Sequence, residues 1–230
     1  MKDIEARAII FDMDGTLYKF DQRDESNFIS SNFGEQIYAN CVRFFEERFS
    51  LTKEEAVAKY QELSQKYAGE VSIAVEKEYG IDRSEYFAFT WDLKVEDFIE
   101  FTTEVRELLS SLALNIGILT AAPKVWAERV LTFLQVKELF KEAVFTGDPD
   151  LRKPNPQAFQ QLADFWGLNP EEIISIGDQE QSDILPAKSL GMTTVRIAKN
   201  VETEADFQAV DLLEAIAILK NEGIICKKLK

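Results

Sequence analysis

Two aspartates stand two positions apart at the end of an apolar run near the start of the sequence. The run 9–11 leads into Asp12 and Asp14, and a turn at Gly15 and Thr16 follows. Residues i and i+2 of an extended chain share a face, so the two carboxylates would converge where the strand ends. Paired acids repel unless a cation lies between them or one keeps its proton. The pattern indicates an acid pair that does chemistry, although alone it also fits a solvated strand end or a helix cap.

A threonine and a lysine follow two further apolar segments. The Thr120 hydroxyl and the backbone N–H of Ala121 could hold an anionic oxygen at the end of a strand. Lys153 lies in a loop flanked by prolines and could stand over a phosphate. The same residues also fit a threonine that ends a strand or caps a helix, and a solvated surface lysine.

A second acidic pair follows another apolar run. Asp178 comes directly after Gly177, and Asp183 lies about one helical turn further along. Carboxylate oxygens are the ligands that Mg²⁺ prefers in proteins. A Gly-Asp turn followed by a helix-capping acid is the alternative explanation of this pair.

The composition narrows the chemistry further. The sequence has no histidine, which excludes Ser-His-Asp and Cys-His nucleophiles, histidine-ligated zinc and phosphohistidine. Two isolated cysteines, Cys41 and Cys226, form neither a disulfide framework nor a zinc motif. Carboxylates, lysines, hydroxyls, backbone amides and a hard metal ion remain as the possible agents of catalysis.

The charge and hydropathy of the chain limit its partners. A formal net charge of −15 speaks against nucleic-acid polymers and anionic membranes, because both are bound through lysine and arginine. We find no apolar run of the ~20 residues that span a bilayer, and no pattern of a signal peptide. We therefore expect a cytoplasmic protein, either a monomer or a homodimer, without a membrane or nucleic-acid partner.

Short apolar segments alternate with segments of helical period, and this alternation predicts an α/β protein with a parallel sheet. The expected strands are Arg7–Asp12, Asn115–Leu119, Ala143–Thr146, Glu172–Gly177 and Thr193–Ile197. Ligands of such sheets bind at the carboxyl ends of the strands. The groups expected at that edge are Asp12, Thr120, Gly147 and Asp178.

Residues 19–91 interrupt the alternation with two apolar stripes of helical spacing. The stripes consist of Phe33, Ile37, Cys41, Phe44, Phe45 and Phe49, and of Ala56, Tyr60, Leu63 and Tyr67. A capping box, Thr52 to Glu55, opens the second stripe. The segment therefore predicts a small helical bundle inserted after the first strand.

The order and spacing of the four polar elements resemble the haloacid dehalogenase superfamily of phosphohydrolases. The resemblance implies a Rossmann-like parallel-sheet core formed by residues 1–18 and 92–230. It also implies that residues 19–91 form an inserted all-α cap of the C1 type, which would close over the site, exclude water and select the leaving group.

The resemblance assigns a role to each matching residue. Asp12 corresponds to the nucleophile, which forms an aspartyl-phosphate, and Asp14 to the acid and base that protonates the leaving alcohol and then activates water. Lys153 corresponds to the lysine that balances the charge of nucleophile and phosphoryl group. The phosphate-binding groups implied are Met13, Thr120, Ala121 and Lys153.

The same resemblance implies a Mg²⁺ cofactor. Its ligands would be the carboxylates of Asp12, Asp178 and Asp183 and the main-chain carbonyl of Asp14, and Asp183 would bind directly or through water. Mg²⁺ prefers about six oxygen ligands. Charge stabilisation carries most of phosphoryl transfer.

The expected function is that of a Mg²⁺-dependent phosphatase acting on a small-molecule phosphate monoester. The segments 51–56, 66–69 and 81–86 resemble, more weakly, the pyrimidine 5′-nucleotidase branch. On that alternative an aromatic side chain would stack on a base, whereas aromatic residues that fill the bundle core are the plainer expectation. The candidates for stacking are Tyr18, Phe20, Tyr86, Phe89 and Trp91. A non-catalytic phosphate-sensing or interaction protein on the same fold is the alternative from a different class.

Overall fold

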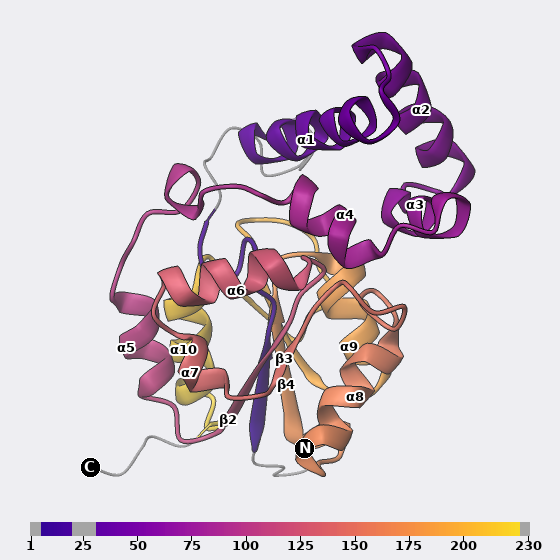
Figure 1. The fold of residues 1–230 in the computed structure, drawn as a ribbon. Coiled ribbons are helices and arrows are strands. Elements are labelled where there is room, and N and C mark those ends of the chain that lie inside the picture. The colour runs from indigo at the N-terminus through magenta and orange to yellow at the C-terminus, as the bar shows by residue number, and fades with distance from the viewer. Residues whose placement is uncertain (1–5, 20–30, 226–230) are drawn as a thin grey trace. The chain divides into compact units, whose positions relative to one another are not determined.

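The computed structural model describes residues 6–19 and 31–225, and the chain divides into two compact units (Figure 1). One unit consists of Met1–Phe20 and Ile99–Lys230, and the other of Asp21–Phe98. The sequence placed these bounds at 19 and 91, so the return to the first unit comes seven residues later than expected. The difference arises because a 3-10 turn at Val95–Asp97 still belongs to the helical unit. Phe20 lies outside the described residues.

The first unit is built on a six-stranded, wholly parallel sheet with the order β3-β2-β1-β4-β5-β6. The strands are β1 (Ala8–Phe11), β2 (Asn115–Leu119), β3 (Val144–Phe145), β4 (Ile173–Gly177), β5 (Thr193–Ile197) and β6 (Phe207–Ala209). Every residue of β1 and β4 is buried, as expected for strands that helices cover on both faces. Phe11, the last residue of β1, pairs with Ile118 and Ile176, so the carboxyl ends of three strands lie side by side.

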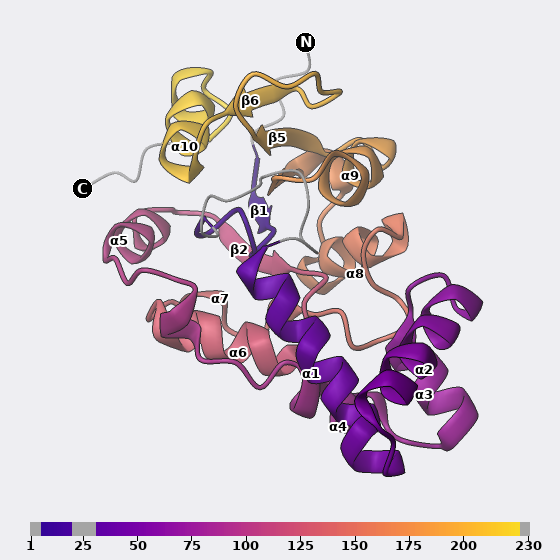
Figure 2. The same ribbon diagram turned by 90° about the horizontal axis from the view of Figure 1, so that it is seen from above.

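Helices cover both faces of this sheet (Figure 2). On one face lie α8 (Pro156–Trp166) and α9 (Leu185–Ser189). On the other lie α5 (Glu104–Ser110), α6 (Lys124–Phe133), α7 (Lys137–Phe140) and α10 (Leu212–Asn221). This two-sided layering confirms the predicted Rossmann-like α/β class.

Alternate residues of β1 serve the two faces. Ala8 and Ile10 join a cluster of buried side chains from α8 and α9. Phe11 meets Phe140 of α7 edge to face at 6.5 Å between ring centroids. Each face of the central strand is therefore packed, which fixes the position of its carboxyl end.

The five predicted strands are present, with two differences. β3 has only two residues, because the chain turns away at Thr146 to form the loop before α8. β6, a sixth strand of three residues, was not predicted. α8 begins at Pro156 and is capped by Asn155, whose side chain accepts from the N–H of Gln157.

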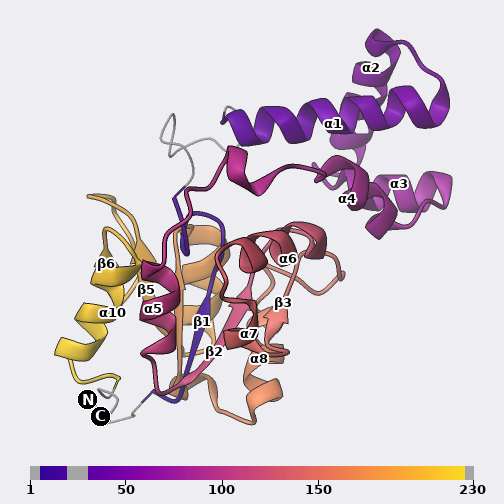
Figure 3. The same ribbon diagram turned by 60° about the vertical axis from the view of Figure 1, so that its left-hand side comes forward.

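Within residues 31–98, the described part of the second unit, four α-helices precede the 3-10 turn, and Figure 3 shows them from another side. They are α1 (Asn32–Phe49), α2 (Lys53–Lys66), α3 (Val71–Tyr79) and α4 (Arg83–Thr90). The predicted capping box is confirmed, because Thr52 and Glu55 bond each other's backbone N–H groups at the start of α2. Tyr86 is buried and meets Phe44 edge to face at 4.9 Å, so it belongs to the core of this bundle.

Among the residues that the structure describes, no helix has the length and hydropathy needed to span a bilayer.

Candidate active site at the carboxyl edge of the sheet

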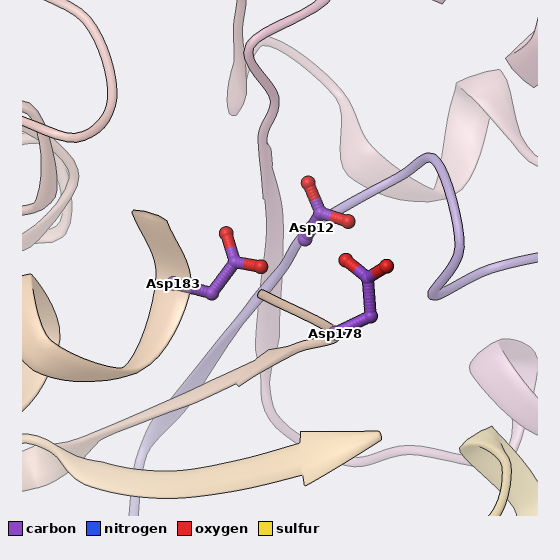
Figure 4. Close-up of side chains that lie close together, drawn as sticks. All are labelled: Asp12, Asp178 and Asp183. Atoms are coloured by element: carbon purple, nitrogen blue, oxygen red, sulfur yellow. The ribbon is translucent and has the colours of Figure 1, made fainter. Parts of the chain in front are cut away.

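Three aspartates from two neighbouring strand ends meet at the centre of the sheet edge (Figure 4). Asp12 follows β1, Asp178 follows β4, and Asp183 lies in the π-helical turn Glu180–Ile184 that comes next. One carboxylate oxygen of each lies within 4.8 Å of the others. Figure 4 shows the three carboxylates turned toward a common space. The structure thus brings together three of the four aspartates of the two acidic motifs, Asp12, Asp178 and Asp183.

Lys153 is the cation of this cluster. Its Nζ donates to Asp12 Oδ1 at 2.6 Å and to Asp183 Oδ1 at 2.5 Å, and the residue is only 5% exposed. Burial by itself would lower the pKa of Lys153, but the charges of Asp12 and Asp183 outweigh it and raise the pKa. The lysine is therefore charged and fixed beside the carboxylates, so the solvated-lysine alternative is wrong.

Asp12 is held at both of its oxygens. Lys153 occupies Oδ1, and the Thr16 hydroxyl donates to Oδ2 at 2.9 Å. The backbone N–H of Asp12 donates to Ile176 O at 2.9 Å, which ties the end of β1 to β4. Burial raises the pKa of Asp12 to about 7, although Lys153 acts in the opposite direction. The sequence pattern places Thr16 in the turn after Asp14 but does not indicate that its hydroxyl binds Asp12.

Asp183 is oriented by its own turn. Its Oδ2 accepts the backbone N–H of Gln179 at 2.9 Å, and Ser182 donates to Oδ1. A Cβ on Gly177 would lie 2.4 Å from the Asp183 side chain, so only glycine fits there. The tight approach of the turn to the strand end brings Asp183 to the cluster from five residues beyond Asp178.

Asp178 has an unsatisfied oxygen. Among the described residues, its Oδ1 is buried without any hydrogen-bond partner. Burial, and then the nearby charge of Asp12, raise the pKa of Asp178 to about 8. Buried polar atoms are normally paired, and a carboxylate that lacks a partner is expensive. The site is therefore built for a further positive group.

A divalent cation fits this requirement. The three carboxylates, when ionised, carry two more negative charges than Lys153 balances. Their donor atoms are all oxygens, the set that Mg²⁺ prefers. A cation among them would also give the Asp178 oxygen the partner that it lacks.

Asp14 is turned to a different set of partners. Its Oδ1 accepts hydrogen bonds from the Tyr18 hydroxyl and from Trp126 Nε1, the latter at 2.9 Å. Thr120 Oγ1 donates to Oδ2 at 3.4 Å. Burial raises the pKa of Asp14, and the bonds from Tyr18 and Trp126 act against it. Tyr18 is thus a hydrogen-bond donor of the site.

The remaining predicted groups lie in the turns that frame the cluster. Thr120 is buried, and its hydroxyl also accepts the Ala122 N–H at 3.1 Å. Ala121 is exposed, and Met13 is buried with its carbonyl closing the turn to Thr16. The residues expected to bind phosphate through their backbone thus lie in the loops after β1 and β2.

The loop after β3 does not reach the acidic cluster through Gly147. A Cβ on Gly147 would lie 2.0 Å from Ala121 O, so this glycine permits contact between two loops. The next residue, Asp148, accepts the backbone N–H of Lys124 at 2.6 Å and thereby caps α6.

Two partners of Asp14 had no usable signal in the sequence. Trp126 lies 112 positions from Asp14 and belongs to an apolar helix, where a tryptophan predicts only core. Tyr18 was noticed for its ring and not for its hydroxyl. Tyr18 and Trp126 become identifiable as partners of Asp14 only from the fold, which places α6 over the loop after β1.

The sequence matches the model of the haloacid dehalogenase-like hydrolase family over residues 6–191. Together with the parallel sheet and the acidic cluster, this match defines the class of protein. The chain belongs to the haloacid dehalogenase-like hydrolase family.

Individual relatives agree with this assignment. The chain is 27% identical to the glyceraldehyde 3-phosphate phosphatase of Methanopyrus kandleri over 210 residues, 84% of each chain. It is 31% identical to the protein of the same name from Methanocaldococcus jannaschii over 119 residues, 49% of this chain and 52% of that one. The crystal structure of a phosphatase of this family from Thermococcus onnurineus has the same fold, with a TM-score of 0.59 and 24% identity, over 93% of this chain and 98% of that one.

Proposed function

We propose that this protein is a Mg²⁺-dependent phosphatase that hydrolyses a small phosphate monoester through a phosphorylated Asp12. The observation that carries the proposal is the buried Lys153 ammonium between Asp12 and Asp183, next to an Asp178 oxygen without a partner. Lys153 and a divalent cation bound by the carboxylates would together supply positive charge where a transferring phosphoryl group needs it, although the whole chain is acidic. The phosphatase names of the relatives support the same reaction class.

In the first step, an oxygen of Asp12 attacks phosphorus while the bond from phosphorus to the ester oxygen breaks. Thr16 and Lys153 hold the two oxygens of this carboxylate, so its attack geometry is fixed before substrate arrives. Asp14 gives its proton to the departing alkoxide, which leaves as an alcohol.

In the second step, water attacks the phosphorus of the aspartyl-phosphate. Asp14, now ionised, takes a proton from this water, the bond between Asp12 and phosphorus breaks, and inorganic phosphate leaves. Asp14 thus ends the cycle protonated, and Lys153 balances the negative charge that returns to Asp12.

The metal ion would be held by Asp12, Asp178 and Asp183 together with the main-chain carbonyl of Asp14. When bound, Mg²⁺ supplies positive charge that stabilises the phosphoryl oxygens as the bond to the leaving group breaks. The helical unit 21–98 follows directly on the loop that carries both catalytic aspartates, and we assign it the role of a cap over the leaving group.

The test is phosphate release from a panel of esters by the full chain, with Mg²⁺ or with EDTA. The panel contains glyceraldehyde 3-phosphate, phosphoglycolate, sugar phosphates, nucleoside monophosphates and 4-nitrophenyl phosphate. We expect Mg²⁺-dependent turnover that Asp12→Asn abolishes while the fold persists. Absence of turnover on every ester by a folded, Mg²⁺-binding protein would favour the sensing role, and full activity of Asp12→Asn would reject the covalent mechanism.

A further inference from the structure

The Asp14 carboxyl is held unevenly, and its two oxygens have different surroundings. Oδ1 receives two hydrogen bonds, from the Tyr18 hydroxyl and from Trp126 Nε1. Oδ2 has the Thr120 hydroxyl at 3.4 Å, a distance at the outer limit of a hydrogen bond. One oxygen is thus anchored and the other is only loosely engaged.

The two anchoring side chains are themselves immobile. Trp126 is fully buried in the first turn of α6, and Tyr18 is only 8% exposed. A buried indole N–H or phenol is costly without a partner, and Asp14 Oδ1 provides one for both side chains. The two act together, because both donate to the same oxygen.

The chemistry of the donors decides where a proton can be on Asp14. An indole N–H only donates, and the Tyr18 hydroxyl donates to the same oxygen, so the two bonds occupy both lone pairs of Oδ1. As long as both donors hold Oδ1, the carboxyl proton resides on Oδ2, the oxygen that Thr120 contacts weakly.

We propose that Tyr18 and Trp126 are positioning residues that fix the Asp14 carboxyl through Oδ1 and leave Oδ2 as the oxygen that exchanges protons with the leaving group and with water. The inference rests on the proposed function and adds to it a device for aiming the acid, contributed by α6 and by the loop after β1. Neither side chain touches the reacting atoms, so both act through Asp14.

The kinetic test compares Tyr18→Phe and Trp126→Phe with the wild type on an alkyl phosphate and on 4-nitrophenyl phosphate. A misdirected acid slows departure of the leaving group, the step that kcat/KM reports, only for the ester whose leaving group needs a proton; slower attack of water on the aspartyl-phosphate would affect kcat on both esters alike. General acids contribute roughly 10²–10⁴ to a rate, so partial misdirection should lower kcat/KM on the alkyl ester about tenfold or more. On the aryl ester kcat/KM should fall less than about threefold.

A double-mutant cycle separates positioning from a general structural effect. In the Asp14→Asn background, adding Tyr18→Phe should cost less than about twofold on the alkyl ester, because the acid that Tyr18 orients is already absent. Matched controls are Trp166→Phe and Tyr86→Phe, which remove a partly buried indole and a buried phenol outside the site. Equal losses on both esters, or additive losses in the cycle, would overturn the inference.

A spectroscopic measurement keeps the inference testable without any turnover. The chain has three tryptophans and hence three indole N–H resonances, of which Trp126→Phe assigns one. We expect this resonance to move in Asp14→Asn, and the Trp166 resonance to stay in place. An unmoved Trp126 resonance refutes the inference, whereas a moved one with no activity on any ester points to failure of the proposed function alone.

Discussion

A lysine buried between two aspartates is stable only if its charge is compensated. Lys153 meets this condition through two short contacts, and the two aspartates in turn depend on it. Removing one partner of a buried ion pair leaves the other charge exposed to the low-dielectric interior, which costs far more than the loss of a surface pair.

Lys153→Met should therefore damage both stability and turnover. We expect the metal-free protein to lose about 3 kcal/mol of unfolding free energy, and kcat to fall about a hundredfold or more. Denaturant unfolding with EDTA and steady-state kinetics with Mg²⁺ measure the two effects. The matched control is Lys66→Met, since Lys66 pairs with Glu78 at the surface with its side chain 59% exposed. A loss no larger than in this control would contradict the assigned role.

Gly15 is a second position in the site, where the addition of a single Cβ atom would disturb a neighbouring carboxylate. Its φ is +87°, and a Cβ would lie 2.4 Å from Asp178 Oδ2. Gly191 has the same φ, but there a Cβ would meet Glu171 Cγ at an ordinary 3.5 Å. A comparison of Gly15 with Gly191 therefore separates the effect of backbone strain from the effect of displacing the Asp178 carboxylate.

Gly15→Ala and Gly191→Ala should each lower the unfolding free energy by about 1 kcal/mol or more, since both impose a strained backbone. Only Gly15→Ala should weaken Mg²⁺ binding, by about tenfold or more, because it displaces Asp178. Calorimetric titration with Mg²⁺ measures the affinity. Equal affinities in the two variants would show that the approach to Asp178 has no part in binding.

At the scale of elements, the structure distinguishes local from distant capping. Thr52 was predicted as a cap, because it bonds an N–H only three positions along the chain. Asp148 was not predicted, because it caps α6 from 24 positions beyond Lys124. The pattern around Pro123 gave no hint of it, since the helix has no side-chain cap of its own. Trp126 escaped prediction for the same physical reason: its partner is distant in sequence.

Asp148→Ala should lower the unfolding free energy by about 1–2 kcal/mol, the usual value of a helix cap, while Asp148→Asn keeps most of it. Because Trp126 lies in the first turn of α6, the alanine variant should also lower kcat/KM on alkyl esters more than on aryl esters. Asn155→Ala is the control, as it removes a cap from α8 without altering Asp14. If Asp148→Ala lowers the unfolding free energy but leaves the kinetics on both esters unchanged, the position of α6 has no part in orienting Asp14.

At the scale of the whole molecule, the parallel sheet converts a sequence pattern into a site. Five apolar segments were enough to predict the sheet, because buried parallel strands are continuously apolar. The sixth strand was missed, since Phe207–Ala209 has only three residues and contains a glutamine. The acidic cluster followed from the sheet, since strand ends share an edge. What the sequence could not supply was which oxygen meets which donor, as with Lys153 and Asp183.

Metal ions and protons compete for the carboxylates at this edge of the sheet, so both the stability of the protein and its Mg²⁺ affinity depend on pH. Burial raises the pKa of Asp12 to about 7 and that of Asp178 to about 8, above the ordinary 3.8 of the unfolded chain. Between these values the metal-free folded protein keeps protons that the unfolded chain has released, so its stability falls as pH rises from about 4 to 8. Mg²⁺ needs the ionised carboxylates and gains affinity over the upper part of the same range.

The rise in unfolding temperature on adding Mg²⁺ should therefore be larger at pH 8 than at pH 6, because the metal-free protein is weaker and Mg²⁺ binds more tightly at the higher pH. Thermal unfolding at both pH values, with Mg²⁺ or EDTA and the ionic strength held constant with NaCl, measures this difference. Constant ionic strength matters, since a chain of net charge −15 is stabilised by any added cation through screening. Asp178→Asn is the control, and it should abolish the Mg²⁺ effect at both pH values. A rise that is equal at pH 6 and pH 8, or that persists in Asp178→Asn, would place the bound Mg²⁺ outside this cluster.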